Sequence, residues 1–173
     1  PVVYDFVFNG WGMKFPADYD NLITRMLVAN DVFADAVVPV NMQPFVLEGG
    51  SIETDGEGTL LSTVECLASV NRNEYLDQEG LETYLSEVLG INRFLWLRSG
   101  YLAGDDTDSH IDTLARFCDV KTIAYVKCED PEDEHFAELE EMERELLEFR
   151  TEDGDPYRLV ALPMADPVYW EGE

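Results

Sequence analysis

The feature that most constrains the fold of this chain is a repeat in the order of its predicted elements. Residues 44–97 predict a hairpin, a helix and a strand, and residues 108–163 predict the same order. Within the two units, the letters SIET at 51–54 are matched by HIDT at 110–113. A shared order together with a shared motif favours a tandem ββαβ unit. Because such units bury their faces against neighbouring copies, we expect an α/β fold built from adjacent repeats.

Short runs rich in β-branched and aromatic residues predict the strands. These runs are VVYDFVF at 2–8, ADAVVPV at 34–40, RFLWL at 93–97 and YRLVALP at 157–163. The Asp-Gly-Glu-Gly turn at 55–58 lies between two strand-like runs and is typical of a hairpin. SHIDTLARF at 109–117 and VKTIAYV at 120–126 predict a second hairpin.

Apolar residues at helical spacing predict three helices. The first begins at an Asp18 cap, ends near Asn30, and has a buried face of Leu22, Ile23, Met26 and Leu27. The second spans residues 78–89 and ends at Gly90, a residue type common after helix ends. The third begins with Asp130 as cap and Pro131 in the first helical position. Its predicted buried stripe consists of Phe136, Leu139, Met142, Leu146 and Phe149.

The charge of the chain argues against several classes of partner. Among its 173 residues, 11 are Lys or Arg and 37 are Asp or Glu, which gives a net charge of −26. Nucleic-acid phosphates and anionic membrane surfaces both require clustered basic residues. A hydrophobic content of 46% is sufficient for one domain with its own core. The acidic excess therefore favours solubility, with a cationic small ligand as the alternative.

Cysteine usage and hydropathy indicate a reducing cytoplasm. The three cysteines, Cys66, Cys118 and Cys128, form neither a Cys-x-x-Cys motif nor an even set. They therefore predict neither a disulfide framework nor a zinc ribbon. No apolar run is long enough for a membrane span, and no signal peptide is recognisable. Because the chain begins at Pro1 rather than Met, we expect a processed protein or part of a longer one.

The acidic stretch GDDTDSHID at 104–112 does not fit a metal loop. Counted from Asp106, the fifth, sixth and twelfth positions are histidine, isoleucine and phenylalanine. A calcium loop places an acid, a glycine and a glutamate there. A zinc site needs more His or Cys nearby, and the other histidine is His135, on a predicted acidic helix. We therefore expect neither a metal ion nor a cofactor.

Two other patterns in the chain are candidates for chemistry. If His110 and Asp112 lie in a strand, both side chains point to one face. An imidazole beside a carboxylate forms an acid/base unit near neutral pH, although a hydrogen-bonded histidine on a solvent-facing strand remains the alternative. Glu48 precedes Gly49-Gly50, where the backbone can bend sharply and aim the carboxylate inward. An ordinary turn is the alternative there.

Three blocks of sequence carry a family resemblance. They are FNGWGMKF at 8–15, FVLEGGSIETDGEGTLLSTVECLASVNRN at 45–73 and WLRSGYLAGDDTDSHIDTLARF at 96–117. In order and spacing they resemble the agmatine deiminase and bacterial peptidylarginine deiminase family. The resemblance implies the pentein fold, a five-bladed α/β propeller of ββαβ units around a central site. Residues 1–173 would then be a partial pentein domain of about two to three blades.

The resemblance also implies an activity and a set of roles. The implied reaction is hydrolysis of the guanidinium of agmatine or peptidyl-arginine to a ureido group and ammonia. It proceeds through a cysteine thiouronium intermediate. If agmatine is the substrate, the reaction belongs to putrescine biosynthesis. His110 would be the general acid/base, Asp112 a guanidinium clamp and Glu48 a second catalytic, substrate-binding carboxylate. Asp106 and Asp108 would shape the turn and bind the substrate together with Asp112 and Glu48. The partner would be a cationic guanidinium molecule or an arginyl peptide, and open propeller sides favour self-association.

The chain departs from the family pattern at three points. Position 109 is Ser where Gly is usual. Position 53 is Glu where agmatine-type members often carry His, which leaves a peptidylarginine-like substrate open. The Arg-Asp segment and the Gly-rich segment ending in the nucleophilic cysteine are not found. We therefore expect a fragment that is inactive alone. The alternatives are an acidic cation-binding module without catalysis and a related pentein acting on free or methylated arginine.

Overall fold

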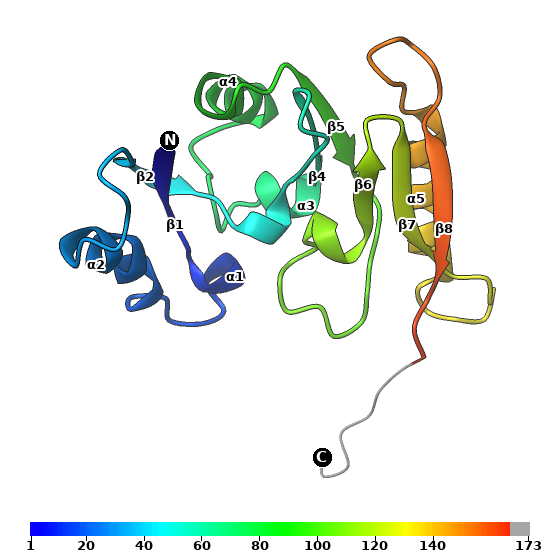
Figure 1. Cartoon of the computed structure of the whole chain (residues 1–173). Helices are drawn as coiled ribbons and strands as arrows, with labels where there is room; N and C mark the ends of the chain where they lie inside the picture. Colours follow the sequence, from blue (N-terminus) through cyan, green and yellow to red (C-terminus); the bar gives the residue numbers. More distant parts are fainter. Residues whose placement is uncertain (167–173) are drawn as a thin grey trace.

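Three small sheets follow one another across the molecule, and a crossover helix lies beside each one (Figure 1). The computed structural model describes residues 1–166 and has the expected α/β character. The strands are β1 Val2–Val7, β2 Val38–Val46, β3 Glu53–Thr54, β4 Thr59–Thr63, β5 Arg93–Leu97, β6 Ala115–Asp119, β7 Thr122–Lys127 and β8 Arg158–Pro163. The α-helices are α1 Gly10–Met13, α2 Ile23–Ala29, α3 Val64–Leu67, α4 Gln78–Leu89 and α5 Phe136–Glu148. Short 3-10 turns are η1 Asp20–Leu22, η2 Gly49–Ser51 and η3 Ile111–Thr113.

The second and third sheets have the same topology. In the second, β3 pairs antiparallel with β4, and β4 pairs parallel with β5 after the crossover through α4. In the third, β6 pairs antiparallel with β7, and β7 pairs parallel with β8 after α5. The first sheet contains the parallel pair β1 and β2, joined through α2. The predicted hairpin around 55–58 and the strand at 93–97 are confirmed.

The central strand β4 contributes to both hydrophobic cores. Leu60 packs in a cluster with residues of α3, α4 and the end of β2, whereas Leu61 packs with residues of β5, β7 and α5. Successive residues of a strand point to opposite faces, so one strand serves two cores. Helix α5 contacts both β5 and β7. The second and third sheets are therefore joined by a continuous apolar layer.

The start of helix α4 was predicted correctly, whereas the start of helix α5 was not. Helix α4 has the predicted bounds, with the Asp77 side chain capping Gly80 N–H and Gly90 in the left-handed region. Helix α5 begins at Phe136 rather than at Pro131. The Asp130 carboxylate accepts a hydrogen bond from Glu132 N–H, so a local turn competes with the helix there. The predicted stripe of α5 is confirmed, with Leu139, Met142 and Leu146 fully buried and Phe136 and Phe149 partly buried.

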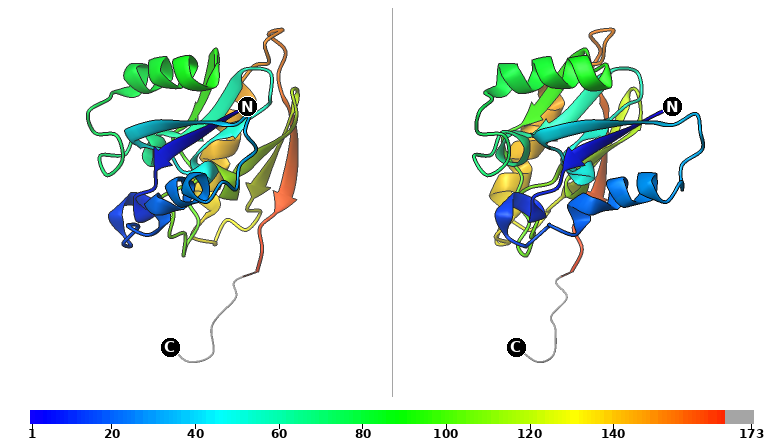
Figure 2. Two further views of the ribbon diagram at one scale, coloured as in Figure 1. Left: turned by 60° about the vertical axis from the view of Figure 1, so that its left-hand side comes forward. Right: turned by 90° about the vertical axis from the view of Figure 1, so that its left-hand side faces the viewer.

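The first predicted helix is wrong in its start and in its buried face. The segment forms η1 and then α2, and Asp18 does not cap either one. Asn21 instead binds the backbone of Phe8 on both sides, which holds the segment in a turn. No residue of α2 is buried, and Ile23 and Met26 are 54% and 59% exposed. Figure 2 shows α2 on the outer side of β1 and β2.

Strand β2 also departs from its predicted position. It was expected at 34–40, but it begins at Val38 and continues to Val46. Its pairing with β1 is interrupted by a register shift between Asp5 and Val7. Strand β2 ends at Val46, shortly before the turn that follows Glu48. No helix in residues 1–166 is both long enough and apolar enough to cross a membrane.

Candidate active site

Glu48 is a buried carboxylate that already accepts several hydrogen bonds. Its Oε2 accepts from Arg72 Nη2 at 2.6 Å, Arg72 Nε at 3.1 Å and His110 Nε2 at 2.7 Å. Its Oε1 accepts from the backbone N–H of Trp11 at 3.1 Å. Burial by itself would raise the pKa of Glu48, but hydrogen bonds from His110 and Arg72 outweigh burial and lower this pKa below its usual value. Glu48 is therefore held as a carboxylate.

His110 lies between two carboxylates and is 5% exposed. Its Nε2 faces Glu48 at 2.7 Å, and its Nδ1 lies 3.9 Å from Asp112 Oδ1. An ionised carboxylate only accepts hydrogen bonds, so the proton of this contact must belong to Nε2 of the ring. Nδ1 is then the ring atom left for proton exchange with a ligand, on the side where Asp112 lies.

The segment that carries His110 and Asp112 is not the strand that the sequence predicted. His110 stands just before the 3-10 turn η3, with φ −55° and ψ 136°. Asp108 and Ser109 have positive φ values of 60° and 61°, which reverse the chain before the histidine. Thr113 Oγ1 donates to the His110 carbonyl and closes the turn. Residues 110–112 are therefore not in the predicted strand, although the side chains of His110 and Asp112 do face each other.

Gly50 is the residue that makes room for this pair. A Cβ at position 50 would lie 2.4 Å from His110 Nδ1 and 2.7 Å from Asp112 Oδ2. The neighbouring Gly49 has nothing within 4 Å of the same hypothetical atom. The turns η2 and η3 thus approach each other so closely that only glycine fits at position 50.

The turn before His110 is organised by Asp105. Its Oδ1 accepts from the N–H of Thr107 at 2.8 Å and also from the Thr107 hydroxyl. Its Oδ2 accepts from the N–H of Ser109 at 2.7 Å. Burial opposes ionisation, but these hydrogen bonds lower the pKa of Asp105 below its usual value. The backbone of Ser109 is thus held by this carboxylate at its positive φ of 61°.

Asp106 and Asp108, which were predicted to shape the turn and bind substrate, lie next to Lys14. Asp108 Oδ1 pairs with Lys14 Nζ at 2.6 Å, and the Asp106 carbonyl accepts from the same ammonium at 2.9 Å. The Asp106 side chain is exposed. The structure thus brings Glu48, His110 and Asp112 together, and it places these two aspartates on the adjoining turn.

Arg72 is the member of this cluster that the sequence did not reveal. Its side chain is 1% exposed and binds Glu48 directly. The only available signal was an arginine between Asn71 and Asn73, inside a family-like block of a chain poor in basic residues. The backbone contribution of Trp11 had no signal in the residue types, because an N–H group is common to all of them except proline.

Three side chains of the site lie close enough to be considered as metal ligands. Donor atoms of Glu48, Cys66 and His110 fall within 4.8 Å of one another. Burial raises the pKa of Cys66 to about 12, so its thiolate is costly to form. The Glu48 oxygen is already bonded to Arg72 and His110. This donor set does not fit a metal ion.

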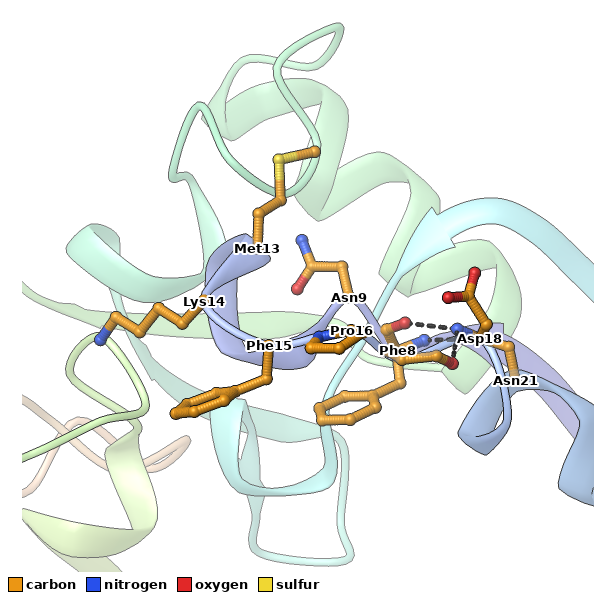
Figure 3. A pocket seen from close by; sticks show the side chains of 9 residues that line it. Phe8, Asn9, Met13, Lys14, Phe15, Pro16, Asp18 and Asn21 are labelled. Carbon is orange, nitrogen blue, oxygen red and sulfur yellow. Dashed lines mark hydrogen bonds between the residues drawn. The ribbon is translucent and has the colours of Figure 1, made fainter.

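An open pocket of about 430 Å³ adjoins α1 (Figure 3). Phe8 and Phe15 lie along one side of it, and the Asn21 side chain binds the Phe8 backbone. Lys14 also lines this pocket, whereas Glu48, His110 and Asp112 do not. The pocket is therefore a separate feature from the acid/base cluster.

Solved structures similar to this chain define its class. A Porphyromonas gingivalis protein, provisionally assigned as an arginine deiminase, is 58% identical with a TM-score of 0.96 and covers 100% of this chain and 51% of its own. The agmatine deiminase of C. jejuni is 40% identical with a TM-score of 0.79, over 98% of this chain and 47% of its own. The fold is thus that of the deiminases.

The family is defined more closely by sequence. The pattern of the Porphyromonas-type peptidyl-arginine deiminases matches residues 1–173, and the chain belongs to this family. A Vibrio parahaemolyticus protein provisionally named agmatine deiminase is 37% identical over 163 residues, which are 94% of this chain and 45% of the relative. The chain spans about half the length of the relatives that it matches. The resemblance inferred from the three sequence blocks is confirmed.

Proposed function

We propose that the protein to which this chain belongs hydrolyses a guanidinium group, on agmatine or on a peptidyl-arginine, to a ureido group and ammonia. The observation that carries the proposal is the buried pair of Glu48 and His110, with Asp112 facing the free side of the imidazole. Family membership supports the same reaction class. If agmatine is the substrate, the product belongs to putrescine biosynthesis.

The three polar side chains have different roles in this proposal. Asp112 is 38% exposed at its side chain, and no Lys or Arg within residues 1–166 forms an ion pair with it. Its carboxylate therefore has acceptor capacity for a planar, cationic guanidinium. Glu48 was predicted as a second clamp, but its Oε2 already binds the guanidinium of Arg72. We therefore assign Glu48 to hold His110 and Asp112 to hold the substrate.

His110 transfers the protons of the reaction. A cysteine thiolate attacks the guanidinium carbon, and the imidazolium donates its Nδ1 proton to the departing nitrogen, which leaves as ammonia. The neutral ring then takes a proton from water at Nδ1. The resulting hydroxide adds to the thiouronium carbon, and the C–S bond breaks to restore the thiolate. The hydroxyl group of the product then loses its proton to solvent, which leaves the neutral ureido group. This division into two steps lowers the barrier because each step has a good leaving group.

None of the three cysteines of the chain is assigned as this nucleophile. Cys66 is fully buried with a raised pKa, Cys118 is exposed on β6, and Cys128 is buried after β7. A nucleophile needs an accessible thiolate beside the acid/base group. The thiolate is therefore expected from another part of the protein.

We also propose that the sheets are blades of a pentein propeller. The units 44–97 and 108–163 would be two blades, and β1, α2 and β2 would be part of a third. The identical strand order of the second and third sheets supports this arrangement. The exposed apolar residues of α2 favour contact with a further copy or segment.

The test is ammonia release by the full-length enzyme from agmatine and from an arginyl peptide. Asp112→Asn keeps the shape of the side chain but removes the charge that faces the guanidinium. We expect turnover to fall about a hundredfold or more, as when a preorganised electrostatic contact is lost. Asp35→Asn, at an exposed position outside the site, serves as control. Near-wild-type turnover by the Asp112 variant would remove Asp112 from the site.

A further inference from the structure

Arg72 connects three segments that are distant in sequence. Its Nε and Nη2 bind Glu48 Oε2, Nη2 also binds the Thr107 carbonyl at 2.8 Å, and Nη1 binds the Cys66 carbonyl at 3.3 Å. These acceptors lie in the turn after β2, in α3 and in the turn that leads to His110. One guanidinium therefore holds the histidine's carboxylate partner and the loop that carries the histidine.

The chemistry of this contact requires an arginine. A buried cation must have its lost hydration replaced by acceptors in fixed directions. The planar guanidinium offers five donors, and three of its nitrogens are used here on acceptors that diverge in direction. Lysine has the charge, but its compact ammonium has no such fork. Because the side chain is 1% exposed and its nitrogens are occupied, Arg72 is not available to bind a substrate.

We propose that Arg72 is a positioning residue for proton transfer at His110, and this inference rests on the proposed function. It holds Glu48 with Oε2 aimed at His110 Nε2, and through Thr107 it fixes the start of the turn that delivers the ring. As a result the proton stays on Nε2, and Nδ1 remains directed to the side of Asp112. Loss of Arg72 frees both the carboxylate and the turn, so the ring loses its fixed tautomer.

The second histidine of the chain is an internal reference for this tautomer. His135 Nδ1 lies 2.6 Å from Asp133 Oδ1, and its Nε2 accepts the N–H of Ala103 at 2.9 Å. His135 therefore carries its proton on Nδ1, the opposite nitrogen from His110. Nitrogen-15 spectra of the full-length protein distinguish the two tautomers directly, at about pH 9 where ordinary histidines are neutral.

The experiment compares the wild-type chain with Arg72→Met and Arg72→Lys. We expect His110 to be protonated at Nε2 in the wild type, to exchange between tautomers in Arg72→Met, and to be intermediate in Arg72→Lys. His135 should stay unchanged in all three. Arg116→Met is the matched control, because Arg116 also pairs with a glutamate, Glu53, but does not touch the cluster. An unchanged His110 in a folded Arg72→Met chain overturns the proposal.

A measurement on the wild type covers the case in which Arg72→Met does not fold. The Nε–H of Arg72 should exchange with water far more slowly than that of Arg144, whose side chain is 60% exposed. Equal exchange rates would show that the guanidinium is not held in the cluster, and would overturn the proposal as well. The other titratable groups that face Glu48, Arg72 and His110 are Cys66, Asp105, Asp108 and Asp112.

Kinetics of the full-length enzyme separate this inference from the proposed function. Arg72→Lys should lower kcat by about tenfold to a hundredfold, the effect of a misplaced catalytic group, while KM changes little. Its pH profile should shift, and Arg116→Met should match the wild type. A wild type that releases no ammonia from any guanidinium contradicts the proposed function but leaves the tautomer test valid. An active Arg72→Lys variant with unchanged kcat and pH profile contradicts the positioning role alone.

Discussion

The Glu48 carboxylate makes the stability of the protein depend on pH. Its pKa in the folded chain lies below the ordinary value of 4.5, so the unfolded chain binds its proton more tightly. This contribution is complete above the unfolded pKa and is lost as the pH falls through the folded one. We expect Glu48→Gln to lower the free energy of unfolding by ~3 kcal/mol near neutral pH, because Arg72 loses its charged partner.

Urea unfolding of both proteins at about pH 7, 5 and 3 measures this effect. The gap between wild type and Glu48→Gln should shrink from about pH 4.5 downward, where Glu48 of the unfolded chain begins to take up its proton. The exposed residue Glu57 provides the control, and Glu57→Gln should show no comparable pH dependence. A gap of constant size over this range would contradict the assignment of an ionised, hydrogen-bonded Glu48.

The adjacent glycines Gly49 and Gly50 provide a matched pair for a second prediction. In Gly50→Ala the new methyl group meets His110 Nδ1 and Asp112 Oδ2 at distances below 3 Å, so one of them must move. A shift of about 1 Å in a catalytic group reduces turnover by about a hundredfold. Gly49→Ala adds a methyl group in open space and should keep both turnover and stability. Equal ammonia release by the two full-length variants would contradict the close approach at Gly50.

Single-residue patterns identified the acids of the site better than the arginine that holds them. The Glu-Gly-Gly and His-x-Asp motifs indicated Glu48, His110 and Asp112, which do come together. Arg72 was missed because its burial depends on acceptors 24 and 35 residues away, which only the folded chain assembles. Isolated arginines are mostly exposed, so residue type alone argues for the surface.

At the scale of elements, α4 and the buried face of α5 were predicted correctly, whereas the start of α5 and the buried face of α2 were not. The 3.6-residue pattern located α4 and the buried stripe of α5, because burial of one face repeats along the sequence. The start of α5 was misplaced because side-chain turns such as that at Asp130 compete with helix formation. A strand was predicted where the 3-10 turn η3 lies. The turn is too short to distinguish a helical period from a strand period in its sequence.

Glu53 joins the second sheet to the third, and this contact predicts an effect on stability. Its Oε2 accepts from Arg116 Nε at 2.6 Å, and its Oε1 accepts from Phe117 N–H at 3.0 Å. Residue 53 was considered for substrate choice, yet its carboxylate binds strand β6. Glu53→Ala should cost about 1–3 kcal/mol because a half-buried N–H loses its charged acceptor. Thermal unfolding beside Glu57→Ala measures this cost, and equal stability of the two variants would contradict the contact.

At the scale of the whole molecule, the repeat in element order was the most informative pattern. It predicted a hairpin, a helix and a strand in residues 44–97 and 108–163, and the second and third sheets have this order. The first sheet lacks an antiparallel strand beside β1 within the described residues. Its helix α2 is exposed on the outer side (Figure 2). A periodic sequence pattern could not predict the exposure of α2, because periodicity indicates the apolar face of a helix but not what covers that face.

The last prediction concerns the chemistry of the 173 residues as a unit. Residues 1–166 contain His110, which we propose as the proton-transfer residue, and the carboxylates Glu48 and Asp112. Of the three cysteine thiols in this part of the chain, only Cys118 is exposed. Cys66 lies near His110 but is fully buried, and its pKa is raised to about 12. Water cannot easily replace a thiolate, since a guanidinium is resonance-stabilised and a poor electrophile. Removing one member of a cooperating catalytic set removes most of the effect of the set.

We therefore expect the isolated chain to release no ammonia above background from agmatine, arginine or arginyl peptides. Weak guanidinium binding remains, because Asp112 is present and its carboxylate has no arginine or lysine partner in residues 1–166. A coupled ammonia assay before and after alkylation with iodoacetamide measures the first expectation. Calorimetric titration with agmatine measures the second, with an Asp112→Asn chain as the binding control. Turnover that alkylation abolishes would show that one of Cys66, Cys118 and Cys128 is a nucleophile. In that case the exposed Cys118 is the first to replace by serine, because alkylation reaches it without unfolding the core.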